Sequence, residues 1–205
     1  RQEENEFIML QLINVSYSVQ EDGVKKDIIK NVSATIDKRF VAITGPNGGG
    51  KSTLAKIIAG IVSPTEGQIL FDGEDITNAS VTERAKMGIS YAFQQPVRFK
   101  GITVMDLIKL AAGKNIAVAG ACDYLSQVGL CARDYINREV NASLSGGELK
   151  RIEIATVLAR GTGFTVFDEP EAGIDLWSFN NLIAAFEKMR VETRGTILII
   201  SHQER

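Results

Sequence analysis

Hydrophobic and polar positions alternate along the first forty residues, and longer apolar and helical blocks follow. Period-2 and β-branched patterns run through MLQLINVSYSV and GVKKDIIKNVSATIDKRFVAITG, with breaks at Asp22-Gly23 and Asp37-Lys38. This alternation predicts a small set of antiparallel strands that leads into one buried strand, Phe40–Thr44. The pattern then becomes helical over Lys51–Ala59 and stops at Gly60.

The rest of the chain alternates short apolar runs with amphipathic stretches. Strands are predicted at GQILFDG, GISYAFQQP, FTVFDE and GTILIISH, and helices at SVTERAK, TVMDLIKLAA, ACDYLSQVGL, LSGGELKRIEIATVLAR and Leu176–Val191. Capping signals mark the starts of two of these helices, at Ser80 to Glu83 and at Thr103 to Asp106. Buried strands that alternate with helices indicate an α/β fold with a mostly parallel sheet. Residues from about 101 to 142 form a helical insert in this pattern.

The length of 205 residues suits one large domain or two small lobes that share a core. We expect one domain over residues 9–205, with an N-terminal antiparallel β subdomain and a helical subdomain at about 96–160. We expect residues 1–8 to be an added extension ahead of a natural start at Met9.

Composition narrows the class of protein only modestly. Hydrophobic residues make up 44% of the chain and the formal net charge is −2, so no basic surplus indicates a nucleic-acid partner. The longest apolar run, Thr196–Ile200, is far shorter than the roughly 18 residues of a membrane span. Cys122 and Cys131 match no common zinc or redox spacing, so we expect reduced thiols in a cytoplasmic protein.

A glycine-rich segment follows the predicted strand and opens the predicted helix. GPNGGGKS fits G-x-x-x-x-G-K-[ST], and in this setting the pattern is a phosphate-binding loop. Its glycines let successive N–H groups turn inward around an oxyanion, and the helix N-terminus adds its dipole. Lys51 would reach the β- and γ-phosphates, and the Ser52 hydroxyl would ligate Mg²⁺. The candidate nucleotide-binding residues here are Gly45, Pro46, Asn47, Gly48, Gly49, Gly50, Lys51, Ser52 and Thr53.

Two carboxylates end the apolar run FTVF. A strand parallel to the one before the phosphate loop would bring Asp168 and Glu169 to the same sheet edge. There Asp168 would hold Mg²⁺ through its water shell, and Glu169 could orient and polarise an attacking water. In isolation, paired acids at a strand end are often only solvated turn residues.

The segment LSGGE opens another helix. Ser145 can cap that helix, and Gly146 and Gly147 leave the first N–H groups bare. Chemically this is a second anion site without a lysine, and a plain helix cap explains the residues equally well.

The order of these three segments resembles that of the ATP-binding cassette (ABC) ATPases, over essentially Leu12 to His202. The resemblance implies an α/β P-loop NTPase fold with bound ATP and Mg²⁺. It implies that two copies sandwich two ATP molecules, each held by the loop of one copy and the LSGGE of the other. Ser145 and Gly147 would then contact the γ-phosphate of the other copy, and hydrolysis would need a dimer. The implied nucleotide-binding residues of this segment are Ser145, Gly146, Gly147 and Glu148.

Further positions match the family residue by residue. Tyr17 stands where an aromatic side chain stacks on adenine, although a strand core residue is the plainer interpretation. Gln94 matches the glutamine that contacts Mg²⁺ and the water, and His202 matches the switch histidine that touches the γ-phosphate. Asp175 matches the loop that crosses the dimer interface. Because family members usually continue with another strand and helix, we expect a truncation after His202.

Details of the motifs favour one branch of the family. YAFQQPVRFKGIT resembles the AFQ-x-P and glycine pattern of Suf-type ATPases, which assist iron–sulfur cluster assembly. LSGGELKR resembles SGGEKKR, and DEPEAGID is more similar to their SGLD than to the TSALD of transporter subunits. Against this, Pro170 is transporter-like, and the insert between Gln94 and Leu144 is short for that branch.

The main interpretation is therefore a Suf-like ATPase that acts on a soluble scaffold protein. The first alternative is the nucleotide-binding subunit of an ABC membrane transporter, which grips a membrane-embedded subunit from the inner face of the membrane. Pro96–Thr103 is the candidate contact in either case. A regulatory subunit that binds ATP without hydrolysing it is a further alternative, and a P-loop kinase leaves LSGGE unexplained.

Overall fold

The computed structural model describes residues 8–95, 97–113, 116–141, 143–172, 176–192 and 195–201. The chain forms two compact units, of which the first combines Arg1–Tyr91, Gly163–Glu169 and Arg194–Arg205. The second combines Ala92–Thr162 and Pro170–Thr193. Within the described segments, no helix has both the length and the apolar character needed to cross a bilayer.

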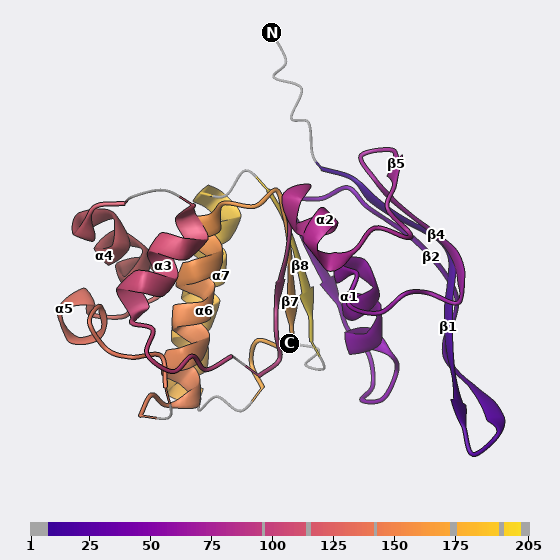
Figure 1. The fold of residues 1–205 in the computed structure, drawn as a ribbon, viewed down its shortest axis with the longest axis horizontal. Helices are drawn as coiled ribbons and strands as arrows, with labels where there is room; N and C mark the ends of the chain where they lie inside the picture. Colours follow the sequence, from indigo (N-terminus) through magenta and orange to yellow (C-terminus); the bar gives the residue numbers. More distant parts are fainter. Residues whose placement is uncertain are drawn as a thin grey trace, which may run out of the picture. The chain divides into compact units, whose positions relative to one another are not determined.

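An antiparallel sheet with the strand order β2-β1-β4-β5 builds one side of the first unit (Figure 1). Its strands are β1 (Leu10–Glu21), β2 (Val24–Ile36), β4 (Glu66–Phe71) and the two-residue β5 (Glu74–Asp75). The period-2 pattern of the sequence is confirmed at the start of β1, where Leu10 and Leu12 are buried. Asn14, at a register shift, has a φ of 50° and its N–H donates to Ser33 Oγ at 2.9 Å.

A second sheet in the same unit has the order β3-β8-β7-β6. It consists of β3 (Phe40–Ile43), β6 (Ile89–Ala92), β7 (Phe164–Asp168) and β8 (Thr196–Ile200). Both β3 and β7 pair with β8 in parallel, which confirms the expected fold class. Strand β7 is buried at every position, as expected. Strand β3 was also expected to be buried, but it is only half-buried and its Ala42 is exposed. The reason is that β3 lies at the edge of the sheet in the described part of the chain.

Helix α1 (Lys51–Ala59) follows the phosphate loop and contacts β2 of the first sheet and β7 and β8 of the second. It runs over the predicted residues and ends at Gly60, whose φ is 79°. Leu54, Ile57 and Ile58 are buried on it and join a core with residues of both sheets. Packing between two sheets thus fixes the start of α1, which is the end that carries the phosphate loop.

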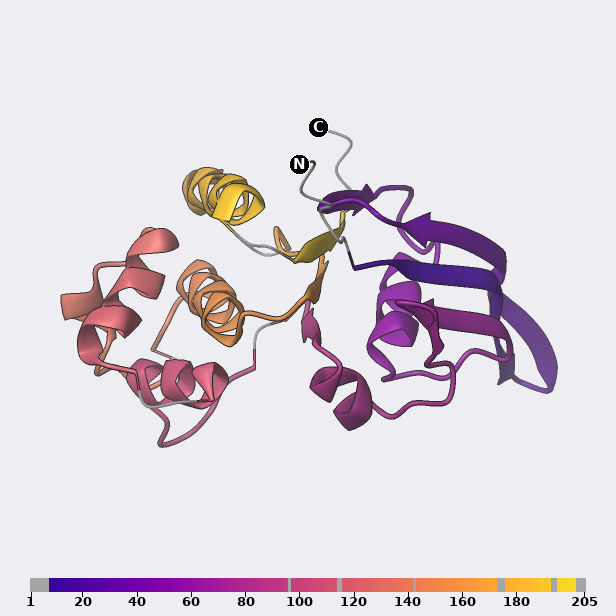
Figure 2. The same cartoon turned by 90° about the horizontal axis from the view of Figure 1, so that it is seen from above.

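The second unit is helical. Its elements are α3 (Val104–Ala112), α4 (Val118–Gln127), α5 (Ala132–Tyr135), α6 (Gly146–Arg160) and α7 (Leu176–Glu192). Figure 2 shows α6 between α3 and α7, and α6 contacts α3, α4 and α7. Capping boxes at Thr103 and Ser145 start α3 and α6. The sequence predicted a helical subdomain at about 96–160, and the compact unit also includes α7, which lies beyond those bounds. The short elements α5 and β5 were not predicted.

A buried arginine fastens the C-terminal end of α1 within the first unit. Arg84, on α2 (Val81–Lys86), is 1% exposed. Its guanidinium donates to the backbone oxygens of Ile57 at 2.6 Å, Ile58 at 2.8 Å, Thr77 at 3.0 Å and Ala79 at 3.0 Å. Burial lowers the pKa of Arg84, which shows the cost of placing this cation in the interior. The positive charge beside the last carbonyls of α1 offsets part of that cost through the helix dipole.

We expect Arg84→Met to lower the free energy of unfolding by about 2–4 kcal/mol, because four carbonyls, two of them buried, lose a charged donor. Urea unfolding measures this difference. Lys86→Met is the matched control, since Lys86 is exposed on the same helix. Equal stability of the two variants would contradict the role given to Arg84.

Candidate active site

The ammonium group of Lys51 ties the phosphate loop together. Lys51 is 8% exposed, and its Nζ donates to Gly45 O at 2.7 Å and to Pro46 O at 2.8 Å. Both acceptors lie at the beginning of the loop, so the side chain crosses back over the segment that precedes it. A buried ammonium that donates to neutral carbonyls can donate to anionic oxygens instead, because hydrogen bonds to charged acceptors are stronger.

Gly50 allows the loop to pass close to β2. Its φ is 80°, and a Cβ atom there would lie 2.7 Å from Ile28 O and 3.1 Å from Ile29 Cγ1. Any side chain would therefore meet backbone, in a region of φ that already favours glycine. The glycine is required here by both conformation and space, and it starts α1 with free N–H groups.

Asp168 connects the end of β7 to the phosphate loop. Its carboxylate is 1% exposed; Ser52 Oγ donates to Oδ1 at 2.8 Å and Tyr91 OH donates to Oδ2 at 2.7 Å. Ser52 and Asp168 lie 116 positions apart in the sequence, and the parallel sheet brings them together as the sequence predicted. A hydroxyl and a carboxylate at this distance are hard oxygen donors that fit Mg²⁺.

Tyr91 is a residue of this site that the sequence analysis missed. It lies in β6, next to β7, and its phenol fixes one oxygen of the Asp168 carboxylate. The available signal was its position in SYAFQ, since a phenol on a strand beside FTVFD needs a hydrogen-bond partner when it is buried.

Glu169 follows Asp168 in a left-handed conformation, with φ at 44°. Its N–H donates to Ile200 O at 2.8 Å, so the backbone is held by β8 while it turns. A non-glycine residue in this region is uncommon and often marks a functional position. Together with the phosphate loop and Ile28, Glu169 lines a hollow of about 180 Å³. Sites for whole small molecules usually enclose about 300–1,000 Å³, so this hollow suits phosphate groups.

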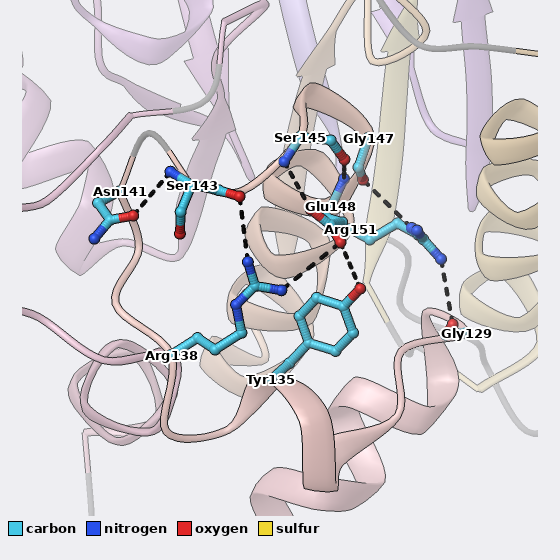
Figure 3. A network of polar contacts seen from close by, with 9 residues as sticks. All are labelled: Gly129, Tyr135, Arg138, Asn141, Ser143, Ser145, Gly147, Glu148 and Arg151. Atoms are coloured by element: carbon cyan, nitrogen blue, oxygen red, sulfur yellow. Dashed lines mark hydrogen bonds and ion pairs between the residues drawn. The ribbon is translucent and has the colours of Figure 1, made fainter.

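The second predicted anion site begins α6 in the helical unit (Figure 3). Ser145 Oγ accepts from Glu148 N at 3.2 Å, and Ser145 N donates to Glu148 Oε2 at 2.6 Å. Tyr135 OH donates to Glu148 Oε1 at 2.5 Å, and Arg138 lies 3.9 Å from the same oxygen. Glu148 is thus committed to supporting the cap, whereas Ser145 and Gly146 are exposed.

The pKa of Glu148 is lowered, first by the Tyr135 hydrogen bond and then by the bonds to Ser145 and the charge of Arg138, against the effect of burial. The same hydrogen bond raises the pKa of the Tyr135 phenol. Arg151 adds a further support, since it donates to Gly147 O at 3.3 Å and Gly129 O at 3.2 Å. The sequence did not predict these supporting roles. Tyr135, at the end of α5, and Arg138, just after it, reach Glu148 only through the fold, and Arg151 of α6 meets Gly129 O in the same way.

The remaining predicted site residues fall in different places. Tyr17 lies on β1 opposite Ile29 and packs, half-buried, against the core of the first unit. Gln94 is exposed and belongs to the second unit. Asp175 and His202 lie outside the described residues. The functions assigned to these four residues stay predictions.

Comparison with known proteins places the chain in a family. Residues 29–172 match the family of ABC transporters. An uncharacterized ABC transporter ATP-binding protein of Methanocaldococcus jannaschii is 39% identical over 188 residues, which cover 87% of this chain and 75% of that protein. The probable ATP-dependent transporter ycf16 of Pyropia yezoensis is 33% identical over 191 residues, covering 86% of this chain and 76% of that protein.

A solved structure extends the likeness to the fold. It is a dimeric ATP-binding cassette in a post-hydrolysis state with bound ADP and Pi, and it is 26% identical with a TM-score of 0.81. The similarity covers 95% of this chain and 88% of that one. The chain belongs to the ABC transporter family. It is an ATP hydrolase of the ABC type, with ATP and Mg²⁺ as its ligands, as the sequence predicted. The relatives carry transporter names, so the transporter alternative fits them better than the Suf-like interpretation.

We expect Tyr91→Phe to raise the Mg²⁺ concentration that gives half-maximal ATP hydrolysis by roughly 10-fold, the scale of one hydrogen bond to a charged group. The reason is that Asp168 loses the donor that orients its second oxygen. A magnesium titration at fixed ATP measures the shift, with Tyr124→Phe on α4 as the matched control. An unchanged magnesium dependence would refute this role of Tyr91.

A second prediction concerns acid stability. Because the folded-state pKa of Glu148 lies below the ordinary 4.5, the unfolded chain binds more protons between the two values. The contribution of Glu148 is therefore fully present above pH 4.5 and is lost as the pH falls through the folded-state value. We expect Tyr135→Phe to lose less stability than the wild type between about pH 7 and pH 3.5 in urea unfolding. Identical pH profiles, with Tyr124→Phe as the control, would argue against it.

Proposed function

We propose that this chain is the ATP-hydrolysing, nucleotide-binding subunit of an ABC transporter and that it works as a pair of copies. The observation that carries the proposal is the Ser52–Asp168 hydrogen bond of 2.8 Å, which joins the phosphate loop to the strand that ends in Glu169. The family match and the likeness to a dimeric cassette support it.

The residues of the first unit divide the work of hydrolysis among them. The N–H groups at the start of α1 bind phosphate oxygens, and Lys51 exchanges its two carbonyl partners for the β- and γ-phosphates. Ser52 and Asp168 would hold Mg²⁺, which when bound neutralises the charge that develops on the transferring phosphoryl group. Glu169, at the edge of the same hollow, orients a water in line with the γ-phosphate and polarises it.

The partner copy completes the site in this proposal. Ser145 and Gly147 of one copy contact the γ-phosphate held by the loop of the other, while the Glu148 side chain supports the helix cap beside them. Support comes from the exposed, already capped start of α6, where hydroxyl and N–H groups form an anion site before any ligand arrives. Tyr17 would stack on adenine, Gln94 would reach Mg²⁺, His202 would touch the γ-phosphate and Asp175 would cross the interface.

The closing of the pair would move a membrane-embedded transporter subunit from the cytoplasmic side. The transporter names of its relatives support this partner. The proposed contact is the segment Pro96–Thr103, of which Pro96 lies outside the described residues. In it Val97 is 46% exposed, and Arg98 and Lys100 are also exposed.

A second candidate is the Suf-like role in iron–sulfur cluster assembly, with a soluble scaffold as partner. It rests on the motif details YAFQQP, SGGELKR and EAGID. Both candidates use the same ATPase chemistry and differ only in what the closing pair moves.

We expect Glu169→Gln to keep ATP binding and to lower turnover by about 10²-fold or more, the scale of a lost general base. Lys51→Ala should instead abolish nucleotide binding, because the loop loses its only ammonium. Phosphate release and binding of a fluorescent ATP analogue measure the two effects, with Lys56→Ala, an exposed residue of α1, as the control. Normal turnover in Glu169→Gln would sink the hydrolysis scheme.

An affinity purification distinguishes the two candidate partners, the membrane-embedded subunit and the soluble scaffold. We expect the Glu169→Gln protein, loaded with ATP in extracts of its own cells, to retain a protein with several apolar spans. Retention of a partner without spans, together with iron in that partner, would overturn the transporter proposal in favour of cluster assembly.

A further inference from the structure

An ion pair on α6, between the buried Lys150 and the half-buried Glu153, binds both the N–H and the C=O of a single residue, Phe93. Lys150 is 2% exposed, and its Nζ donates to Glu153 Oε2 at 2.7 Å and also to Phe93 O. Glu153 Oε1 accepts from Phe93 N at 3.0 Å. The N–H and the C=O of Phe93 are therefore both bound by the two ends of a single pair.

Phe93 links the end of β6 to Gln94. Strand β6 ends at Ala92, so Phe93 is the first residue after the strand, and Gln94 follows it directly. The Phe93 side chain is 43% exposed, and the Phe93 backbone is bound to α6 at both its N–H and its C=O. Lys150 also lines, with Gln94, Gln95, Arg98 and Gly146, a hollow of about 590 Å³ in the helical unit.

The Lys150–Glu153 pair carries a desolvation cost, so helix stability alone does not explain it. An exposed pair three positions apart on a helix contributes little, and burial adds a desolvation cost for both charges. Burial raises the pKa of Glu153, while Lys150 and the Phe93 N–H lower it. Lys150 lies one helical turn after Gly146, so the same face of α6 carries the LSGGE segment and the pair.

We propose that Lys150 and Glu153 form a positioning clamp that sets the backbone of Gln94 and ties it to the LSGGE end of α6. The inference rests on the proposed function, in which Gln94 contacts Mg²⁺ and the attacking water. Neither residue of the clamp touches the nucleotide. Each acts through Phe93, whose fixed N–H and C=O determine where the next residue begins.

The test replaces the whole clamp, because removal of one charge would leave the other buried and unpaired. Lys150→Met/Glu153→Leu keeps apolar volume on α6 and removes both charges. Lys109→Met, an exposed lysine on α3, is the control, and Gln94→Ala shows the effect of losing the positioned side chain. Lys150→Arg is the conservative variant and should recover part of the activity.

Two readouts are needed. Hydrogen exchange of the peptide that spans Phe93–Gln95 should be faster in the double variant than in the wild type and unchanged in α3. Turnover should fall toward that of Gln94→Ala, by about 10²-fold if the group moves by about 1 Å, and more Mg²⁺ should be needed while nucleotide affinity is kept. A merely structural pair would change stability without changing the magnesium dependence.

The outcomes separate the clamp from the function on which it rests. Wild-type exchange at Phe93–Gln95, or faster exchange with wild-type magnesium dependence and turnover, would overturn the clamp. A wild-type chain that does not hydrolyse ATP refutes the proposed function, and the exchange experiment then decides alone whether the pair holds Phe93.

Discussion

The buried ammonium of Lys51 is the constraint on which the phosphate loop depends. Its bonds to Gly45 O and Pro46 O hold the loop closed on itself, and the Gly50 backbone passes so near to β2 that no side chain fits there. The first turn of α1 therefore begins at a held loop, and Lys51, Ser52 and Thr53 of this turn line the phosphate hollow. Preorganised donors of this kind bind an anion without first having to be ordered.

A second constraint follows from the burial of β7. This strand is buried along its whole length, so the carboxylate at its end sits in a place where an unpaired charge would be costly. Ser52 and Tyr91 satisfy both oxygens of Asp168 and thereby connect three segments distant in sequence. The chain turns sharply at Glu169 immediately afterwards, and this turn brings a second carboxylate to the edge of the phosphate hollow.

Much of this could be predicted from residue pattern, because the main signals are local. The helix Lys51–Ala59, its stop at Gly60 and the capping boxes at Ser80, Thr103 and Ser145 depend on neighbours in sequence, and all are confirmed. Parallel strand order predicted that Asp168 and Glu169 lie at the same sheet edge as the phosphate loop, but not the hydrogen bond between Ser52 and Asp168. Tyr135, Arg84 and the bonds of Lys150 and Glu153 to Phe93 could not be predicted, since tertiary packing alone brings these groups to their partners. The burial of β3 was overestimated for the same reason, because an apolar run does not say which strands flank it.

The central claim is that a complete site forms only when the phosphate loop of one copy meets the LSGGE segment of another. The most direct measurement is the molar mass of the Glu169→Gln protein by light scattering, with and without Mg²⁺-ATP, alongside Glu169→Gln/Ser145→Arg. The account predicts that ATP, but not ADP, doubles the mass, and that the Ser145 substitution abolishes the doubling. A protein that stays monomeric at saturating ATP, or pairs equally well with Ser145 replaced, would contradict it.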